Sequence, residues 1–219
     1  MRDRLVSAEA KSIGGRAAGR RLAGLKKSAA ECQRCDLWRR ATQTVFGEGP
    51  SRASLVIVGE QPGDQEDRAG KPFVGPAGLL LDRALVEAGI DRSETYVTNA
   101  VKHFKWTERG KRRIHEKPNR EEVLACRPWL EDEIGAVKPQ AVLALGATAA
   151  ASLFGASVRV MRDRKTWLSS PLAPIAAVTV HPSSILRAPD EQSRQSAFEA
   201  FVADLKRIAR RLERKNESR

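Results

Sequence analysis

The chain has 219 residues, of which 41% are hydrophobic and 30% are charged, and its mean hydropathy is −0.43. This length fits one domain with tails and can bury a core, and the most apolar stretch, residues 141–156, is too short and interrupted to cross a membrane. The 39 Lys and Arg outnumber the 27 Asp and Glu, and the net charge of +12 predicts a polyanionic partner, with nucleic acid as the default.

The first segment, residues 1–20, is rich in Gly, Ala, Arg and Ser and is predicted to be a flexible basic leader. It lacks the apolar core of a secretion signal, so we expect a cytoplasmic protein, associated with the bacterial nucleoid. A single domain is predicted at residues 21–215. It begins with a short helix, residues 22–37, that leads into a pair of cysteines.

Strands and helices are then predicted to alternate along the chain. The apolar, β-branched run that ends at Gly59 indicates a buried parallel strand at residues 55–59. The elements that follow are a helix at 76–89, a strand at 96–98, a helix at 120–136, a strand at 141–145, a helix from 147, a strand at 175–180 and an amphipathic helix at 191–212. This order predicts an α/β fold, a three-layer α/β/α arrangement with a central, mainly parallel four-stranded sheet. Residues 104–118 show no hydrophobic period and are expected to form an insertion-like loop.

Titratable groups follow two of these strands. Glu60 and Gln61 come directly after the first strand, and His181 comes directly after the last one, opening the sequence HPSSILR. Ligands of open α/β sheets bind beyond the carboxyl ends of the strands, so Glu60 and His181 are candidate catalytic groups. The alternatives are a solvated loop carboxylate and a structural histidine.

The chain has three cysteines, and two of them form a CxxC pair, Cys32 and Cys35. In a cytosolic protein this spacing indicates a metal site more than a disulfide. Cys126 is the third candidate ligand and His103 the fourth. From residue types alone, three thiolates and an imidazole suit zinc, and an iron–sulfur cluster is the less usual choice. The alternative for Cys126 is a buried thiol without a ligand.

Four motifs occur in one order along the chain. They are GEQPG at 59–63, GKPFVGPAGLLL at 70–81, TNAVK at 98–102 and HPSS at 181–184. Together they resemble the uracil-DNA glycosylase superfamily, over residues 32–211, and the three cysteines are similar to those of its family 4, which carries an iron–sulfur cluster. Two departures from family 4, His103 in place of a cysteine and KRRIH at 111–115, are features of the UdgX subgroup, which becomes covalently attached to uracil-containing DNA.

The resemblance implies a [4Fe-4S] cluster in place of zinc, held by Cys32, Cys35, His103 and Cys126. It also implies that a uracil is flipped out of the DNA into a pocket. Phe73 would stack on the uracil, its alternative being a core aromatic. The Asn99 amide, with one donor and one acceptor side, would bind uracil O4 and N3–H together, its alternative being a turn-forming Asn.

The HPSS motif is expected to act on the leaving base and the DNA backbone. His181 would donate a hydrogen bond to uracil O2, where negative charge develops as the glycosidic bond breaks. Ser183 and Ser184 would bind a phosphate, and Arg187 would enter the groove left by the flipped base or contact a phosphate.

The UdgX resemblance implies that His115 attacks C1′ of the sugar and stays attached to it, so that the enzyme turns over once. Glu60 would orient the ring and accept its proton. Arg113 is expected to hold the KRRIH segment by pairing with acidic residues. The residues expected to shape this part of the site are Gln61, Asp64 and Asp67.

Two other functions remain open. One is a conventional multiple-turnover glycosylase, and the other is a non-catalytic protein that binds or senses uracil in DNA. In each case the expected partner is uracil-containing DNA. Single-stranded DNA is the primary expectation and double-stranded DNA the secondary one, and the protein is expected to be a monomer.

Overall fold

The structure is a computed structural model that describes residues 2–217, with side chains described from residue 14 onward except that of residue 216. Its centre is a four-stranded sheet of β1 (Leu55–Gly59), β2 (Thr95–Asn99), β5 (Ala141–Leu145) and β6 (Ile175–Thr179). The strand order is β2-β1-β5-β6 and all three pairings are parallel. The predicted α/β fold with a parallel four-stranded sheet is therefore confirmed.

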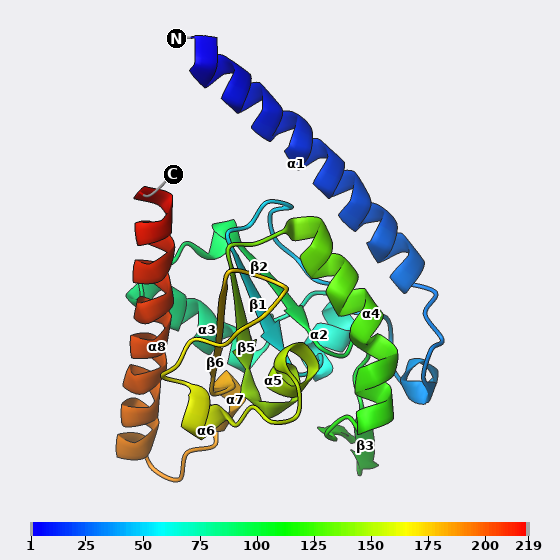
Figure 1. The fold of residues 1–219 in the computed structure, drawn as a ribbon. Coiled ribbons are helices and arrows are strands. Elements are labelled where there is room, and N and C mark those ends of the chain that lie inside the picture. The colour runs from blue at the N-terminus through cyan, green and yellow to red at the C-terminus, as the bar shows by residue number, and fades with distance from the viewer. Residues whose placement is uncertain (1, 218–219) are drawn as a thin grey trace.

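Helices cover both faces of the sheet (Figure 1). The longer helices are α1 (Arg2–Ala29), α3 (Pro76–Glu87), α4 (Arg120–Val137), α5 (Gly146–Phe154) and α8 (Glu191–Glu217). The short ones are η1 (Asp36–Arg39), α2 (Asp64–Ala69), η2 (Arg92–Glu94), α6 (Val160–Asp163) and α7 (Pro182–Leu186). Helices α3 and α8 pack together on one face, and α4 and α5 pack on the other, with α1 outside α4. No helix of residues 2–217 is long and apolar enough to span a membrane.

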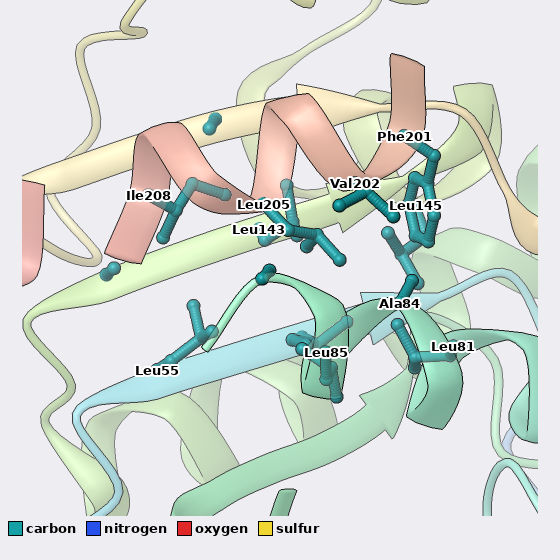
Figure 2. Packing of buried hydrophobic residues seen from close by; sticks show 14 of the residues in the cluster. Leu55, Leu81, Ala84, Leu85, Leu143, Leu145, Phe201, Val202, Leu205 and Ile208 are labelled. Atoms are coloured by element: carbon teal, nitrogen blue, oxygen red, sulfur yellow. The ribbon is translucent and has the colours of Figure 1, made fainter. Parts of the chain in front are cut away.

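The core is divided by the sheet because successive strand residues point to opposite faces. Leu55 and Ile57 belong to the cluster under α3 and α8, whereas Val56 and Val58 belong to the cluster under α4 and α5. Figure 2 shows the first cluster, in which side chains of α8 lie against β5 and those of α3 against β1. Every residue of the four central strands is buried, which explains the continuous apolar runs of β1 and β5.

Two expectations for the N-terminal part differ from the structure. One helix, α1, covers residues 2–29, so the helix expected to begin at residue 22 begins far earlier and takes in most of the predicted leader. The expected helix at 22–37 is interrupted at residues 30–35, where the cysteine pair lies, before the short η1. The boundary between leader and domain at residue 20 stays a prediction.

The loop expected at residues 104–118 is a β-hairpin, so that expectation was wrong. Strands β3 (Trp106–Arg109) and β4 (Arg112–His115) pair antiparallel, separate from the central sheet. A two-residue turn joins them, and its first residue, Gly110, has a φ of +60°, as a type II′ turn requires. The sequence of this hairpin does not alternate between apolar and polar residues, because both of its faces carry mostly polar and charged side chains.

Candidate active site

A cavity of about 960 Å³ opens at the carboxyl ends of the central strands, the edge at which ligands bind in such sheets. Ten of the residues singled out from the sequence line it: Glu60, Gln61, Asp64, Phe73, Asn99, His115, His181, Ser183, Ser184 and Arg187. They come from β2, the hairpin, and the segments that follow β1 and β6. Asp67 and Arg113 lie behind the wall of the cavity instead of lining it.

His181 is held as a neutral imidazole. Its Nδ1 accepts a hydrogen bond from the backbone N–H of Ser183 at 3.2 Å and lies 2.8 Å from the Ser183 hydroxyl. Burial lowers the pKa of His181 to about 4, against the opposing effect of the Glu60 charge. Because Nδ1 is an acceptor, the ring carries its proton on Nε2, which leaves an N–H donor for a ligand. The Ser184 hydroxyl donates to the His181 carbonyl at 2.7 Å and so braces the same turn.

Asn99 and Phe73 form a narrow slot over the end of β1. Asn99 is 3% exposed, and its side-chain amide makes no hydrogen bond within the described part of the chain. The Phe73 ring lies 6.2 Å from the His181 ring, with 27° between their planes, and its backbone is held at a φ of +57°. Both side chains cross directly over Gly59, where an added Cβ would lie 2.7 Å from Phe73 Cζ. The slot offers an aromatic face and an unused amide to a flat, polar ligand.

Glu60 connects the central sheet to the hairpin. The Thr148 hydroxyl donates to Glu60 Oε2, and His115 Nε2 lies 3.3 Å from Glu60 Oε1. Partial burial raises the pKa of Glu60, but the hydrogen bonds from His115 and Thr148 outweigh it, and the net shift is downward. Glu60 is thus an ionised hydrogen-bond acceptor beside the half-exposed imidazole of His115. A general base and the nucleophile that it activates have this arrangement.

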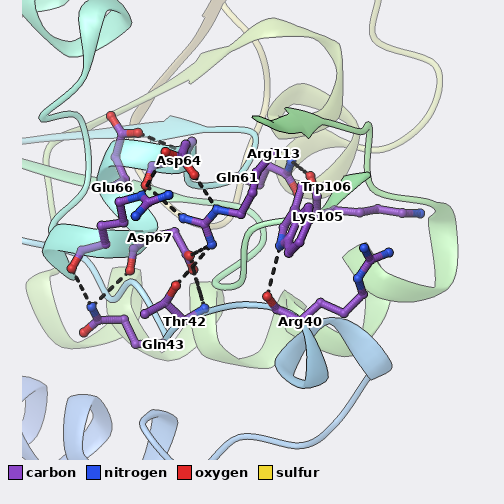
Figure 3. Close-up of polar contacts among 12 residues, drawn as sticks. Arg40, Thr42, Gln43, Gln61, Asp64, Glu66, Asp67, Lys105, Trp106 and Arg113 are labelled. Carbon is purple, nitrogen blue, oxygen red and sulfur yellow. Dashed lines mark hydrogen bonds and ion pairs between the residues drawn. The ribbon is translucent and has the colours of Figure 1, made fainter. Parts of the chain in front are cut away.

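Two further contacts fix the hairpin against the sheet (Figure 3). Gln61 donates to the carbonyls of Lys105 at 3.1 Å and Glu116 at 3.0 Å and accepts from the Lys105 N–H at 3.0 Å, so it holds both ends of the hairpin. Arg113 forms ion pairs with Asp64 and, at 2.7 Å, with Asp67. Desolvation alone would raise the pKa of Asp64, but the hydrogen bonds from Arg68 and Arg113 lower it. Desolvation alone would lower the pKa of Arg113, but the hydrogen bonds to Asp67 and Asp64 raise it. Gln61 is therefore occupied by the protein instead of facing a ligand.

Several contributors to the site were not found from the sequence. Thr148 follows β5 as Glu60 follows β1, so the strand-end rule that identified Glu60 also points to it. Lys117, just beyond the hairpin, lines the cavity as an exposed cation. The Thr42 side chain accepts from Arg113 at 3.1 Å, and its backbone N–H donates to Asp67 at 3.0 Å. No local sequence pattern identifies Thr42, because its role depends only on its contacts with Arg113 and Asp67, which are distant in the chain.

Of the four predicted metal ligands, Cys35, Cys126 and His103 are neighbours near η1 and α4, and Cys32 contacts Trp129 on α4. Cys35 lies beside Cys126 and His103, and these neighbours lower the pKa of Cys35 to about 5, against its partial burial. Cys32 accepts a hydrogen bond from Trp129 Nε1 at 3.1 Å. Among the described residues, no three His, Cys, Asp or Glu side chains are arranged to hold a single metal ion.

The hydrogen bonding of the His103 ring shows whether an imidazole nitrogen is available to a metal group. His103 Nε2 lies 3.0 Å from the Thr44 hydroxyl, whereas its Nδ1 is buried without a hydrogen-bond partner. A buried, unpaired imidazole nitrogen next to a thiol with a lowered pKa provides the donor types that such a group needs. The residues fit a thiolate- and imidazole-bound group.

Comparison with known proteins gives a consistent result. The family pattern of the Uracil DNA glycosylase superfamily matches residues 46–206. A type-4 uracil-DNA glycosylase of Pyrobaculum aerophilum is 39% identical over 165 residues, which cover 72% of this chain and 81% of that protein. The type-4 enzyme of Thermotoga maritima is 36% identical over 173 residues, covering 77% and 85% of the two chains. The match to residues 46–206 contains all the cavity residues named above, whereas the pair Cys32 and Cys35 precedes it.

Proposed function

The chain belongs to the uracil-DNA glycosylase superfamily, and from this we propose that it excises uracil from DNA and remains covalently bound to the sugar through His115. The observation that carries the covalent step is the position of His115 in the cavity wall, with its Nε2 3.3 Å from Glu60 Oε1. A nucleophile within reach of an ionised base is the arrangement that covalent catalysis requires. The proposal places the chain in the UdgX subgroup.

Recognition of the base is assigned to the slot between Asn99 and Phe73. The free amide of Asn99 offers an acceptor to uracil N3–H and a donor to uracil O4, a pattern that cytosine reverses. Phe73 stacks on the flipped base. Ser183, Ser184 and Arg187 contact the backbone beside the flipped nucleotide. Support comes from the position of Asn99 in the cavity wall, where its side-chain amide has no hydrogen-bond partner among the described residues and is available to a ligand.

In the proposed reaction, the bond between C1′ and uracil N1 breaks and its electron pair leaves on the uracil. His181 Nε2–H stabilises the charge that develops on uracil O2. One ring nitrogen of His115 donates its hydrogen bond to Glu60, which leaves the lone pair of the other nitrogen to form the new bond to C1′. The resulting imidazolium gives its proton to Glu60, and the uracil anion is protonated by solvent. Because imidazole is a poor leaving group in a crowded site, the adduct persists.

We assign Cys32, Cys35, His103 and Cys126 to a [4Fe-4S] cluster. When bound, the cluster would supply a structural crosslink between the cysteine pair and α4. Iron and sulfide analysis of the purified protein, together with its visible absorbance, tests this assignment. A colourless protein that contains one zinc per chain would overturn it and favour zinc.

A conventional, multiple-turnover glycosylase is the second candidate, favoured by the match to proteins named as type-4 enzymes over most of this chain. In that reaction a water molecule, oriented by Glu60, attacks C1′ in place of His115. The product would be free DNA with an abasic site.

The two candidates are separated by mixing the protein with a labelled, uracil-containing single-stranded oligonucleotide. A band that survives heat and SDS at the summed mass supports covalent capture, whereas free DNA that breaks under alkali supports multiple turnover. His115→Ser should abolish the adduct while uracil is still released. Ile114→Val, on the opposite face of the same strand, is the matched control and should form the adduct like the wild type. An undiminished adduct in His115→Ser would exclude His115 as the nucleophile.

A further inference from the structure

The hairpin that carries His115 has little structure of its own to hold it in place. Its strands β3 and β4 pair only with each other, in a two-stranded sheet outside the central one. Such an isolated hairpin is marginally stable in water. The distance between His115 and Glu60 therefore depends on anchors outside the hairpin, of which Gln61 and Arg113 are two.

Trp106 provides a third anchor. It lies directly opposite His115 in the register of the hairpin, and directly opposed residues of an antiparallel pair project to the same face. Its indole Nε1–H donates to the carbonyl of Arg40 at 3.0 Å. The guanidinium of Arg40 lies 4.4 Å from the centre of the Trp106 ring, and that of Arg113 lies 5.4 Å from it (Figure 3). The indole thus contacts the segment that follows the cysteine pair and also packs against the arginine that binds Asp64 and Asp67.

A purely structural role for Trp106 in the fold is disfavoured by its location. It is only partly buried, and it belongs to none of the four hydrophobic clusters formed by the described residues. Its polar and ring contacts all go to residues that flank the cavity or the cysteine segment. Loss of the indole is expected to loosen the hairpin and leave the central sheet intact.

We propose that Trp106 is a positioning residue for His115 and decides whether the sugar is captured by His115 or by water. This proposal rests on the proposed function. Attack on C1′ requires the imidazole within about 3–3.5 Å of the carbon, and a misplacement of about 1 Å can slow such a step about 100-fold. A loosened hairpin moves His115 away from Glu60 and admits water to C1′. Excision of uracil, which depends on Asn99, Phe73 and His181 in the main body, continues.

The test uses the full chain, a uracil-containing single-stranded oligonucleotide, and two variants, Trp106→Ala and Trp106→Phe. The phenylalanine variant keeps a ring for stacking and loses the hydrogen bond to Arg40, so its effect should be the smaller one. The matched control is Trp167→Phe, because Trp167 is also partly exposed (41%) and also packs against arginines, Arg207 at 5.0 Å and Arg211 at 6.0 Å, away from the cavity. Released uracil, heat-stable adduct and alkali-labile free DNA are measured in each reaction.

In Trp106→Ala, adduct formation is expected to slow about 100-fold, while uracil release stays within about threefold of the wild type and the missing adduct appears as free abasic DNA. Unchanged adduct formation in Trp106→Ala would overturn the proposal. An equal loss of uracil release and adduct would also overturn it, since the residue would then support the whole site. Hydrogen exchange of the hairpin amides, measured without DNA, should quicken in Trp106→Ala and stay unchanged in Trp167→Phe.

If the wild type releases uracil and forms no adduct, the proposed covalent function fails. The exchange measurement then still decides whether Trp106 holds the hairpin. Exchange in Trp106→Ala that matches the wild type would reject the positioning role independently of the chemistry.

Discussion

Replacement of Glu133 by Gln should strongly destabilise the protein. Glu133 on α4 and Lys102 form an ion pair in which both side chains are fully buried. The carboxylate also accepts hydrogen bonds from the Gly47 N–H at 2.7 Å, the Tyr96 hydroxyl at 2.9 Å and the Thr98 hydroxyl at 2.9 Å. Glu133 thus links α4 to β2 and to the segment before β1.

The magnitude follows from the donors that surround this carboxylate. A glutamine presents one oxygen and one NH₂ group, and in either orientation the NH₂ meets donors that formerly bound an oxygen. Lys102 keeps its hydrogen bonds to Thr98 Oγ1 at 2.7 Å and the Asn99 carbonyl at 2.8 Å but loses its counter-charge. Removal of one partner of a buried ion pair costs about 3–5 kcal/mol.

Urea unfolding, followed by circular dichroism, measures this change as a shift of the midpoint at constant slope. The matched control is Glu131→Gln on the same helix, because Glu131 is half exposed and pairs with Arg127 on the surface at 2.8 Å. Its loss should change the free energy of unfolding by less than about 1 kcal/mol. In the double variant Lys102→Met/Glu133→Gln, both charges are gone and the glutamine oxygen still accepts hydrogen bonds, so part of the stability lost in Glu133→Gln should return.

A change of less than about 1 kcal/mol in Glu133→Gln would refute the reasoning. So would a double variant less stable than Glu133→Gln, because the penalty would then come from packing and not from the unpaired charge.

Three further outcomes are expected. Gly59→Ala places a Cβ against Asn99 and 2.7 Å from Phe73 Cζ, so it should lower the free energy of unfolding by about 1–3 kcal/mol and abolish uracil excision. The control is Gly135→Ala, whose Cβ meets nothing within 4 Å. Normal excision by Gly59→Ala would contradict the assigned slot. His181 has a pKa of about 4 in the folded protein against 6.5 as the ordinary value, so the unfolded chain binds its proton first as the pH falls, and up to about 3 kcal/mol of stability should be lost between pH 6.5 and pH 4. His181→Gln should flatten that part of the stability curve, and an unchanged slope would show that another group causes it. Glu60→Gln keeps hydrogen-bonding capacity but cannot take the proton of the imidazolium, so single-turnover adduct formation should slow about 100-fold or more; a variant as fast as the wild type would remove Glu60 from the proton transfer.

The central sheet was predictable from the sequence because its strands are buried on both faces. Short, continuous apolar runs such as residues 55–58 and 141–145 are typical of strands in a parallel sheet that is covered on both faces. The same topology brings the carboxyl ends of the strands to one edge, so Glu60 and His181 could be placed in one cavity from their positions alone.

The hairpin and its anchors were not predictable, because charged and polar side chains replace the apolar alternation that marks most strands. Arg113 and His115 project to the same face of β4 and are held by Asp64, Asp67 and Glu60, so ion pairs perform the role that apolar contacts usually have. Such pairs join residues that lie about fifty positions apart in the chain, and no local pattern encodes them.

The α/β architecture and the motifs that follow its strands could be read from the amino-acid sequence, since both depend on short-range patterns of burial and on the order of the elements. Three features follow from the three-dimensional fold alone: Trp106 lies opposite His115, Asn99 crosses over Gly59, and the ion pair of Lys102 and Glu133 is buried. A charged residue in a sequence predicts exposure, because burial of a single charge is prohibitive. Burial of these two charges is tolerated because the fold brings a partner of opposite charge from another part of the chain.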